Sequence, residues 1–234
     1  MIVHKARPKT VGALGASDAP PRRLVPGILV VLAVIVSAVL LRQARGIPIG
    51  PDAGWQSLMA SHQRVPAFVI AQVLAFVGSS SGALLVTGAV VIIQLCLRRW
   101  HAAIALPITV SLGAVGSTSL KLVSERPSPG GTLDLTTFSF PSGHTTWAAA
   151  FAVALALGLP RVWTMFAAAG WTAFMAWGRT YLDVHWLSDV AAGALLGISL
   201  ALIVDGMLTR LSAQFRWLRP HEGLGRAVVV PDKE

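Results

Sequence analysis

A histidine and an aspartate stand four residues apart near the start of an apolar run, at His185 and Asp189. On a helix this spacing places both side chains on one face. A carboxylate beside one ring nitrogen fixes the imidazole tautomer and leaves the other nitrogen free as a nucleophile or base. Arg179, slightly upstream, offers a planar guanidinium suited to phosphate oxygens. Taken alone, the three residues could equally form an ordinary ion-pair group at a membrane interface.

A second polar segment, Phe140-Pro141-Ser142-Gly143-His144, directly precedes another apolar run. Ser142 is a favourable helix N-cap, and Gly143 lets the backbone come close to a ligand. The free N–H groups at such a helix start can hold an anion, with His144 beside it in the first turn. Taken alone, this segment could be a simple helix cap with an incidental histidine.

The third polar segment, Lys121 to Pro129, contributes the cations Lys121 and Arg126. Cations near a helix C-terminus complement the helix dipole, so this segment too is unremarkable by itself. Together, however, the segments supply three cations, two histidines, one carboxylate and a helix N-terminus. The combination predicts an anion-binding centre with a nucleophile and a general acid.

The elements that must position these residues are expected to be transmembrane helices. The chain of 234 residues is 54% hydrophobic and 12% charged, about half the charged share of a typical soluble domain. Such a composition indicates a bilayer as solvent. We expect one all-α bundle of six spans, with the polar segments at one end of the last four. The expected spans are residues 24–41, 82–97, 102–123, 142–159, 162–177 and 186–208.

The remaining segments complete the expected organisation. Residues 66–77 are apolar but too short to cross a bilayer, so we expect a short interfacial or re-entrant helix. Residues 42–65 are predicted to be a loop because of their Gly and Pro residues. Residues 1–23 and 209–234 are expected to be tails, the first of them disordered, on either side of a membrane domain over 24–208.

Positive charge is distributed unevenly along the chain. Thirteen of the 19 Lys and Arg residues lie in the tails and in the turns at Arg98-Arg99 and Arg161. The positive-inside rule therefore predicts cytoplasmic termini and an extracytoplasmic site at the plasma membrane. The net charge of +9 does not indicate nucleic acid, because the basic residues are scattered through short loops and tails. The single cysteine, Cys96, excludes an intramolecular disulfide.

The three polar segments resemble the signature of the type 2 phosphatidic acid phosphatase superfamily, whose fold is shared with vanadium haloperoxidases. That signature reads K-x6-R-P, then P-S-G-H, then S-R-x5-H-x3-D. Residues 141–144 match the second part fully, and Arg179, His185 and Asp189 match the third in identity and spacing. The resemblance covers roughly residues 82–208, the expected core of the membrane domain.

Two positions depart from this signature. Gly178 stands where the family usually has serine. Counted from Lys121, the K-x6-R-P frame reaches Ser128, so the expected arginine is missing and Arg126-Pro127 is displaced by two residues. We expect Arg126 to reach the phosphate in its place, with Ser128 as a further candidate contact.

The resemblance implies a metal-independent phosphatase that forms a phosphohistidine and needs no cofactor. His185 would be the nucleophile, Asp189 would orient its ring, and His144 would be the general acid. The residues implied to hold the phosphoryl oxygens are Lys121, Arg126, Ser142, Gly143 and Arg179. The implied substrate is a lipid phosphate or diphosphate, with polyprenyl diphosphate as first candidate and phosphatidic acid, phosphatidylglycerol phosphate and a lipid-linked sugar phosphate behind it. Chain length, phosphate number and oligomeric state stay open.

Three alternatives remain beside this interpretation. His144, His185 and Asp189 could form a zinc site, although the neighbouring cations would repel a divalent ion. Because of Ser128, the chain could instead be a non-catalytic protein of this fold that binds or transports a lipid phosphate. A vanadate-dependent haloperoxidase is disfavoured by the short, apolar chain.

Overall fold

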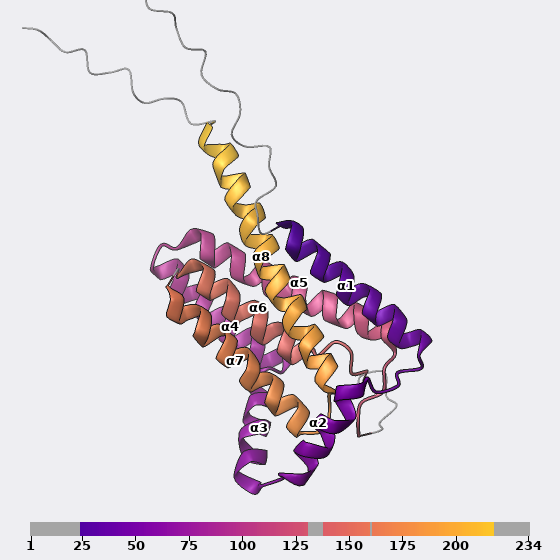
Figure 1. Ribbon diagram of the computed structural model, residues 1–234. Helices are drawn as coiled ribbons and strands as arrows, with labels where there is room; N and C mark the ends of the chain where they lie inside the picture. The colour runs from indigo at the N-terminus through magenta and orange to yellow at the C-terminus, as the bar shows by residue number, and fades with distance from the viewer. Residues whose placement is uncertain (1–23, 131–137, 160, 218–234) are drawn as a thin grey trace, which may run out of the picture.

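Every element in the described part of the chain is a helix. The computed structural model describes residues 24–130, 138–159 and 161–217, with side chains described as far as residue 212, and these ranges contain no strand. Figure 1 shows the helices packed side by side, with α8 extending beyond the others at one end. The described helices are α1 (Leu24–Gln43), α2 (Gly50–Ser61), α3 (Val65–Val77), α4 (Ser80–Cys96), α5 (Trp100–Ser124), α6 (Gly143–Gly158), α7 (Val162–Tyr181) and α8 (Leu187–Trp217).

The expected spans correspond to α1 and α4 to α8, with ends that differ by a few residues. The difference is larger at the end of α7, which continues to Tyr181, and of α8, which continues to Trp217. The predicted tail from residue 209 therefore begins as a continuation of α8, because no Gly or Pro interrupts the chain between Thr209 and Trp217. The predicted N-terminal tail, residues 1–23, lies outside the described residues.

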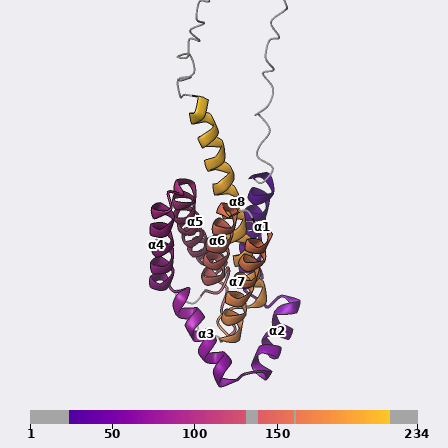
Figure 2. The same ribbon diagram turned by 90° about the vertical axis from the view of Figure 1, so that its left-hand side faces the viewer.

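The segment predicted to be a loop, residues 42–65, contains the helix α2 instead. Gly50 and Pro51 begin this helix, since proline is favoured in the first turn, where its missing N–H costs nothing. Asp52 stabilises the same end by accepting a hydrogen bond from the Ile49 N–H at 2.9 Å. Figures 1 and 2 show that α2 and α3 form an angled pair at the end of the bundle opposite to the projecting end of α8.

Three described helices, α1, α5 and residues 187–212 of α8, are individually long and apolar enough to cross a membrane. The helices α3 and α4 are long and apolar enough to cross a membrane only when they are counted together as one span, which is bent by 67° at a short break. The expected number of six spans is therefore not confirmed. The helix α6 has only 16 residues, or about 24 Å of rise.

Small residues bring α6 and α8 into close contact. A Cβ atom added at Gly193 would lie 2.6 Å from the carbonyl oxygen of Ser142, so only glycine fits there. Ala148, Ala149 and Ala150 of α6 are fully buried. This contact sets the start of α8 beside the start of α6, and so brings two of the three polar segments together.

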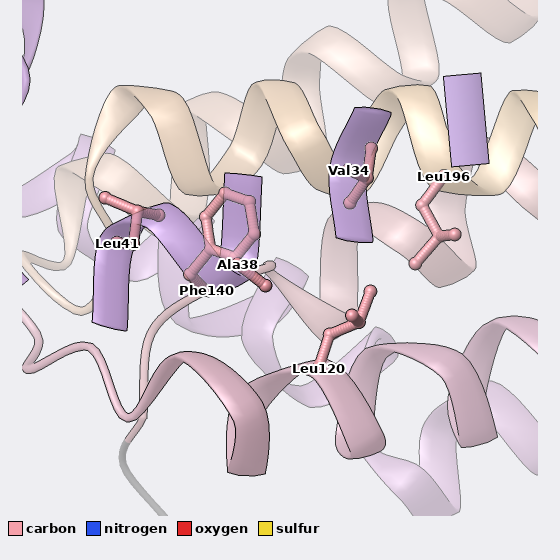
Figure 3. Close-up of a cluster of buried hydrophobic side chains, with 6 residues drawn as sticks. All are labelled: Val34, Ala38, Leu41, Leu120, Phe140 and Leu196. Carbon is pink, nitrogen blue, oxygen red and sulfur yellow. The ribbon is translucent and has the colours of Figure 1, made fainter. Parts of the chain in front are cut away.

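On the other side of α8, an apolar cluster fixes the chain that leads into α6. Figure 3 shows the ring of Phe140 among side chains from α1, α5 and α8. Phe140 is only 2% exposed, and burial of a side chain of this size contributes roughly 1.5–3 kcal/mol. The cluster therefore anchors the second polar segment immediately before its N-cap. Its buried members are Val34, Ala38, Leu41, Leu120, Phe140 and Leu196.

Candidate active site

Backbone hydrogen bonds join the three polar segments. The Ser142 N–H donates to the carbonyl oxygen of Asp189 at 3.0 Å, which links the second segment to the third. The Ser139 N–H, one residue before the second segment, donates to the carbonyl oxygen of Arg126 at 2.8 Å and so ties the start of the second segment to the first. The end of α5 and the starts of α6 and α8 are thereby held at one level of the bundle.

His185 lies in the short connection between α7 and α8 and is 6% exposed. Its Nδ1 is 3.7 Å from Oδ2 of Asp189 and has no hydrogen-bond partner among the described residues. Burial lowers the pKa of His185, and the neighbouring Asp189 raises it only in part. The imidazole is thus neutral near pH 7, the form in which a ring nitrogen can act as a nucleophile.

Asp189 is fully buried in the first turn of α8. Its Oδ2 accepts a hydrogen bond from the Trp186 N–H at 2.8 Å, which satisfies a free N–H at the helix start. The same oxygen faces Nδ1 of His185. The Asp189 carboxylate therefore caps the start of α8 and faces His185 at the same time, and the capping hydrogen bond fixes the orientation of the carboxylate.

His144 lies in the first turn of α6 and contacts α3. Its Nε2 is 3.0 Å from the carbonyl oxygen of Ala75, and because a carbonyl only accepts, this nitrogen must carry the proton. Gly78, immediately after α3, lies so close to the ring that an added Cβ would be 2.6 Å from its Cδ2. The position of His144 thus depends on the bend between α3 and α4.

Lys121 and Arg179 supply positive charge beside both histidines. The charges of both residues interact with His144 and with His185, and those two rings interact with each other. Nε of Arg179 is buried without a hydrogen-bond partner, and no carboxylate of the described chain forms an ion pair with Lys121 or Arg179. Two cations without a protein counter-ion suit a bound anion.

Arg126, which was predicted to contact the phosphate, has carboxylate partners in the structure. Its guanidinium is 0% exposed and lies between two carboxylates. Nη1 donates to Asp189, and Nη2 donates to Asp52 at 2.6 Å. With both terminal nitrogens engaged, these contacts favour a supporting role for Arg126 over a direct phosphate contact.

The other predicted contacts lie near the start of α6 or close to Arg126. Ser142 is the N-cap of α6, and its hydroxyl accepts hydrogen bonds from Thr145. Gly143 follows it and lines the same cavity as His144. Ser128 is 8% exposed.

A cavity of about 680 Å³ opens beside these residues. Lys121, Gly143 and His144 line one part of it, and apolar side chains of α4 and α5 line much of the rest. Leu84 and Leu122 of this wall are more than half exposed at the protein surface. The cavity therefore combines a cationic end with an apolar side that faces outward.

Asp52 and Ser188 are site residues that the sequence did not predict. Asp52 accepts hydrogen bonds from the backbone N–H and the hydroxyl of Ser188, each at 2.8 Å, besides that from Arg126. The signal that could have located it is Gly50-Pro51-Asp52, where proline followed by an acidic residue is typical of a helix start. Within the described ranges, no three or more His, Cys, Asp or Glu residues are grouped to hold a metal ion.

Comparison with known proteins yields a family and a fold. Residues 100–212 match the model of the PAP2 superfamily. A stretch of 79 residues is 38% identical to "Putative undecaprenyl-diphosphatase YbjG" of Escherichia coli (strain K12), and it covers 34% of this chain and 35% of that protein. The match thus spans about a third of the length of that relative.

Two solved structures share the fold. The transmembrane PAP2 type phosphatidylglycerolphosphate phosphatase from Bacillus subtilis is 21% identical, with a TM-score of 0.65 over 77% of this chain and 96% of its own. LpxE of Aquifex aeolicus is 24% identical, with a TM-score of 0.57 over 67% of this chain and 95% of its own. The region that matches the family model contains all three polar segments, and the chain is accordingly a multi-pass membrane protein whose residues 100–212 match the PAP2 superfamily.

Proposed function

We propose that this protein is a metal-independent lipid phosphatase whose nucleophile is His185. The observation that carries the proposal is the cavity, which joins a cationic, histidine-bearing end to an apolar wall at the protein surface. A phosphate head and a hydrocarbon tail on one molecule match these two ends. A phosphate ester that diffuses freely in water would need only the cationic end.

In the proposed first step, Nε2 of His185 attacks phosphorus, a P–N bond forms and the P–O bond to the leaving group breaks. His144, doubly protonated at this stage, gives its Nδ1 proton to the leaving oxygen and becomes neutral. In the second step water attacks the phosphohistidine, His144 takes the proton of that water, and the P–N bond breaks to release phosphate. Because Nε2 of His144 is bonded to Ala75, we assign both proton transfers to its Nδ1.

Charge that develops on the phosphoryl oxygens is stabilised by Lys121, Arg179 and the Gly143 backbone N–H. Neither side chain forms an ion pair with a carboxylate of the described residues, and preorganised donors of this kind are worth most in a site without water. The Ser142 hydroxyl can donate to the same oxygens while it accepts from Thr145. Arg126 is not part of this set, because its guanidinium binds the carboxylates of Asp52 and Asp189.

Among lipid substrates, we place a polyprenyl diphosphate first and phosphatidic acid-type lipids second. The name of the Escherichia coli relative supports this order. The site is proposed to open on the extracytoplasmic face of the plasma membrane, with both termini in the cytoplasm. The support is the excess of Lys and Arg in the tails and in the turns at the opposite ends of the helices.

The direct test is phosphate release by the purified protein in detergent micelles with EDTA present. The substrates are a polyprenyl diphosphate, phosphatidic acid, phosphatidylglycerol phosphate and, as a soluble control, p-nitrophenyl phosphate. We expect release from at least one lipid, unchanged by EDTA. Loss of activity on chelation would point to a metal centre. Tight lipid binding without release would point to the non-catalytic alternative.

Filling the apolar side of the cavity should separate lipid from soluble substrates. Ala114 of α5 lines the cavity, whereas its neighbour Val115 is 65% exposed and does not. Ala114→Trp is expected to raise KM for the lipid by about tenfold or more, since each buried CH₂ displaced costs about 0.8 kcal/mol. The rate with p-nitrophenyl phosphate should stay within about twofold. Val115→Trp is the matched control and should change neither the KM for the lipid nor the rate with p-nitrophenyl phosphate. Equal effects of the two variants would mean that the lipid tail does not bind in this cavity.

Displacing the His144 ring should slow the reaction without unfolding the protein. In Gly78→Ala the new methyl group must push the imidazole or the end of α3 aside, because the added atom would be 2.6 Å from the ring. A shift of about 1 Å can cost about 10²-fold, so we expect kcat to fall by about 10- to 100-fold. Gly88→Ala in α4, where an added Cβ meets nothing within 4 Å, is the control. Unchanged kcat in Gly78→Ala would argue against a catalytic role for His144 in its present position.

A further inference from the structure

Asp52 is a buried carboxylate that the mechanism above does not use. It lies in α2, outside the region that matches the family model, and is 0% exposed. Its Oδ2 accepts hydrogen bonds from Arg126 at 2.6 Å and from the Ser188 hydroxyl at 2.8 Å, while its Oδ1 accepts from the Ser188 N–H. A buried charge is tolerated only when it is paired and hydrogen-bonded in this way.

These contacts continue from Asp52 to the proposed nucleophile. Arg126 donates to Asp52 with one terminal nitrogen and to Oδ1 of Asp189 with the other. The second oxygen of Asp189 faces His185. Ser188 bridges the same groups, because its hydroxyl accepts from Arg126 at 2.7 Å and donates to Asp52. The chain of contacts thus runs from α2 to the His185 ring through two charged side chains.

We propose that Asp52 is a positioning residue for the reaction: through Arg126 it holds the Asp189 carboxylate in the orientation that serves His185. This inference rests on the proposed function. It also assigns to α2 a task in the site, namely to supply the second counter-ion of Arg126.

The balance of charge explains why a second carboxylate is needed. With Asp52 present, two negative groups share one guanidinium, so a net negative charge remains next to His185. Without it, Arg126 would neutralise Asp189 alone, and less negative potential would remain to stabilise the imidazole as it becomes positive. Burial raises the pKa of Asp52, but its hydrogen bonds to Ser188, Arg126 and Ile49 outweigh this and lower it, so the carboxylate is charged at neutral pH.

The test is Asp52→Asn, which keeps the shape of the side chain and removes its charge. We expect kcat per folded molecule to fall by about 10- to 100-fold, the usual cost of losing such an outer partner. KM should stay within about twofold, because Asp52 does not line the cavity. Glu125→Gln is the matched control: Glu125 pairs with Arg42 at 2.6 Å, one residue before Arg126, but both side chains are about half exposed.

The pH profile distinguishes this role from a merely structural one. The charged and titratable groups around His185 are Asp189 of α8, Arg179 of α7, Lys121 of α5 and His144 of α6. When Asp52 is neutralised, Arg126 adds uncompensated positive charge to this set. The acidic limb of kcat/KM, which reports the imidazole that must be neutral to attack, should therefore move to lower pH. A loss of folded protein would instead lower kcat/KM equally at every pH and leave the position of the acidic limb unchanged.

A second variant covers the case in which Asp52→Asn does not fold. Ser188→Ala removes the bridging hydroxyl and leaves both ion pairs, and we expect a smaller loss of kcat with the same direction of shift in pH. Unchanged kcat and pH profile in either folded variant would overturn the proposal. Wild type and His185→Ala, assayed beside them, show whether the reaction itself is as proposed. If wild type is active and His185→Ala is not, a normal Asp52→Asn contradicts only the role of Asp52.

Discussion

His185→Ala is expected to abolish phosphate release from every lipid that the wild-type protein hydrolyses. Removing a catalytic nucleophile typically costs about 10⁴-fold or more, because the positioned cations cannot replace the bond to phosphorus. The measurement is phosphate release under single-turnover conditions, with EDTA present. Lipid binding should persist, since Lys121 and Arg179 still attract the phosphate.

The covalent intermediate gives an independent readout. Wild type quenched during turnover of a ³²P-labelled lipid should carry label that is stable in base and labile in acid, as a phosphohistidine is. His185→Ala should carry none. His62→Ala is the control, because His62 is exposed at the end of α2 and the hydrogen bonds of its ring go to its neighbours Leu58 and Ser61. Label that persists in folded His185→Ala would assign the nucleophile to another residue.

His144→Gln has the second largest expected effect, and the effect should depend on the leaving group. Loss of general acid catalysis costs about 10²- to 10⁴-fold when the leaving oxygen is strongly basic, as in an alkyl phosphate. With p-nitrophenyl phosphate the leaving group departs without a proton. The first step should then be nearly normal, while hydrolysis of the phosphohistidine is slow.

The measurement for this variant is a rapid-mixing experiment. We expect a burst of p-nitrophenolate with an amplitude near one per folded protein, followed by slow turnover. Equal losses with alkyl and aryl substrates, and no burst, would mean that His144 only shapes the site. The milder Gly78→Ala variant should fall between wild type and His144→Gln.

Much of the architecture follows from local sequence. Six apolar runs predicted α1 and α4 to α8 within a few residues at most ends, because side chains that face lipid must be apolar and a chain in a bilayer satisfies its backbone hydrogen bonds by forming helices. The apolar run at 66–77 predicted α3 in the same way. The helix α2 was not predicted, since Gly and Pro residues usually interrupt helices, whereas Gly50 and Pro51 stand where this helix begins. The number of helices that cross the bilayer stays a prediction.

Residue types and spacings also indicated the family, and the comparisons confirmed it. His144, His185, Asp189, Lys121 and Arg179 were proposed for one site because each chemical role needs a particular side chain. Their catalytic roles are still predictions. The sequence could not show which of the cations contacts the phosphate and which one pairs with a carboxylate.

The sequence by itself determined the membrane-embedded helices, the family and the set of reactive side chains, because these depend on composition, local pattern and short motifs. Only the tertiary structure decided the partners of Arg126, which lie 74 residues before it at Asp52 and 63 residues after it at Asp189. It also decided that Gly78 lies against the His144 ring. Contacts over such separations arise from how α2, α3, α6 and α8 pack, and that packing is a property of the whole bundle.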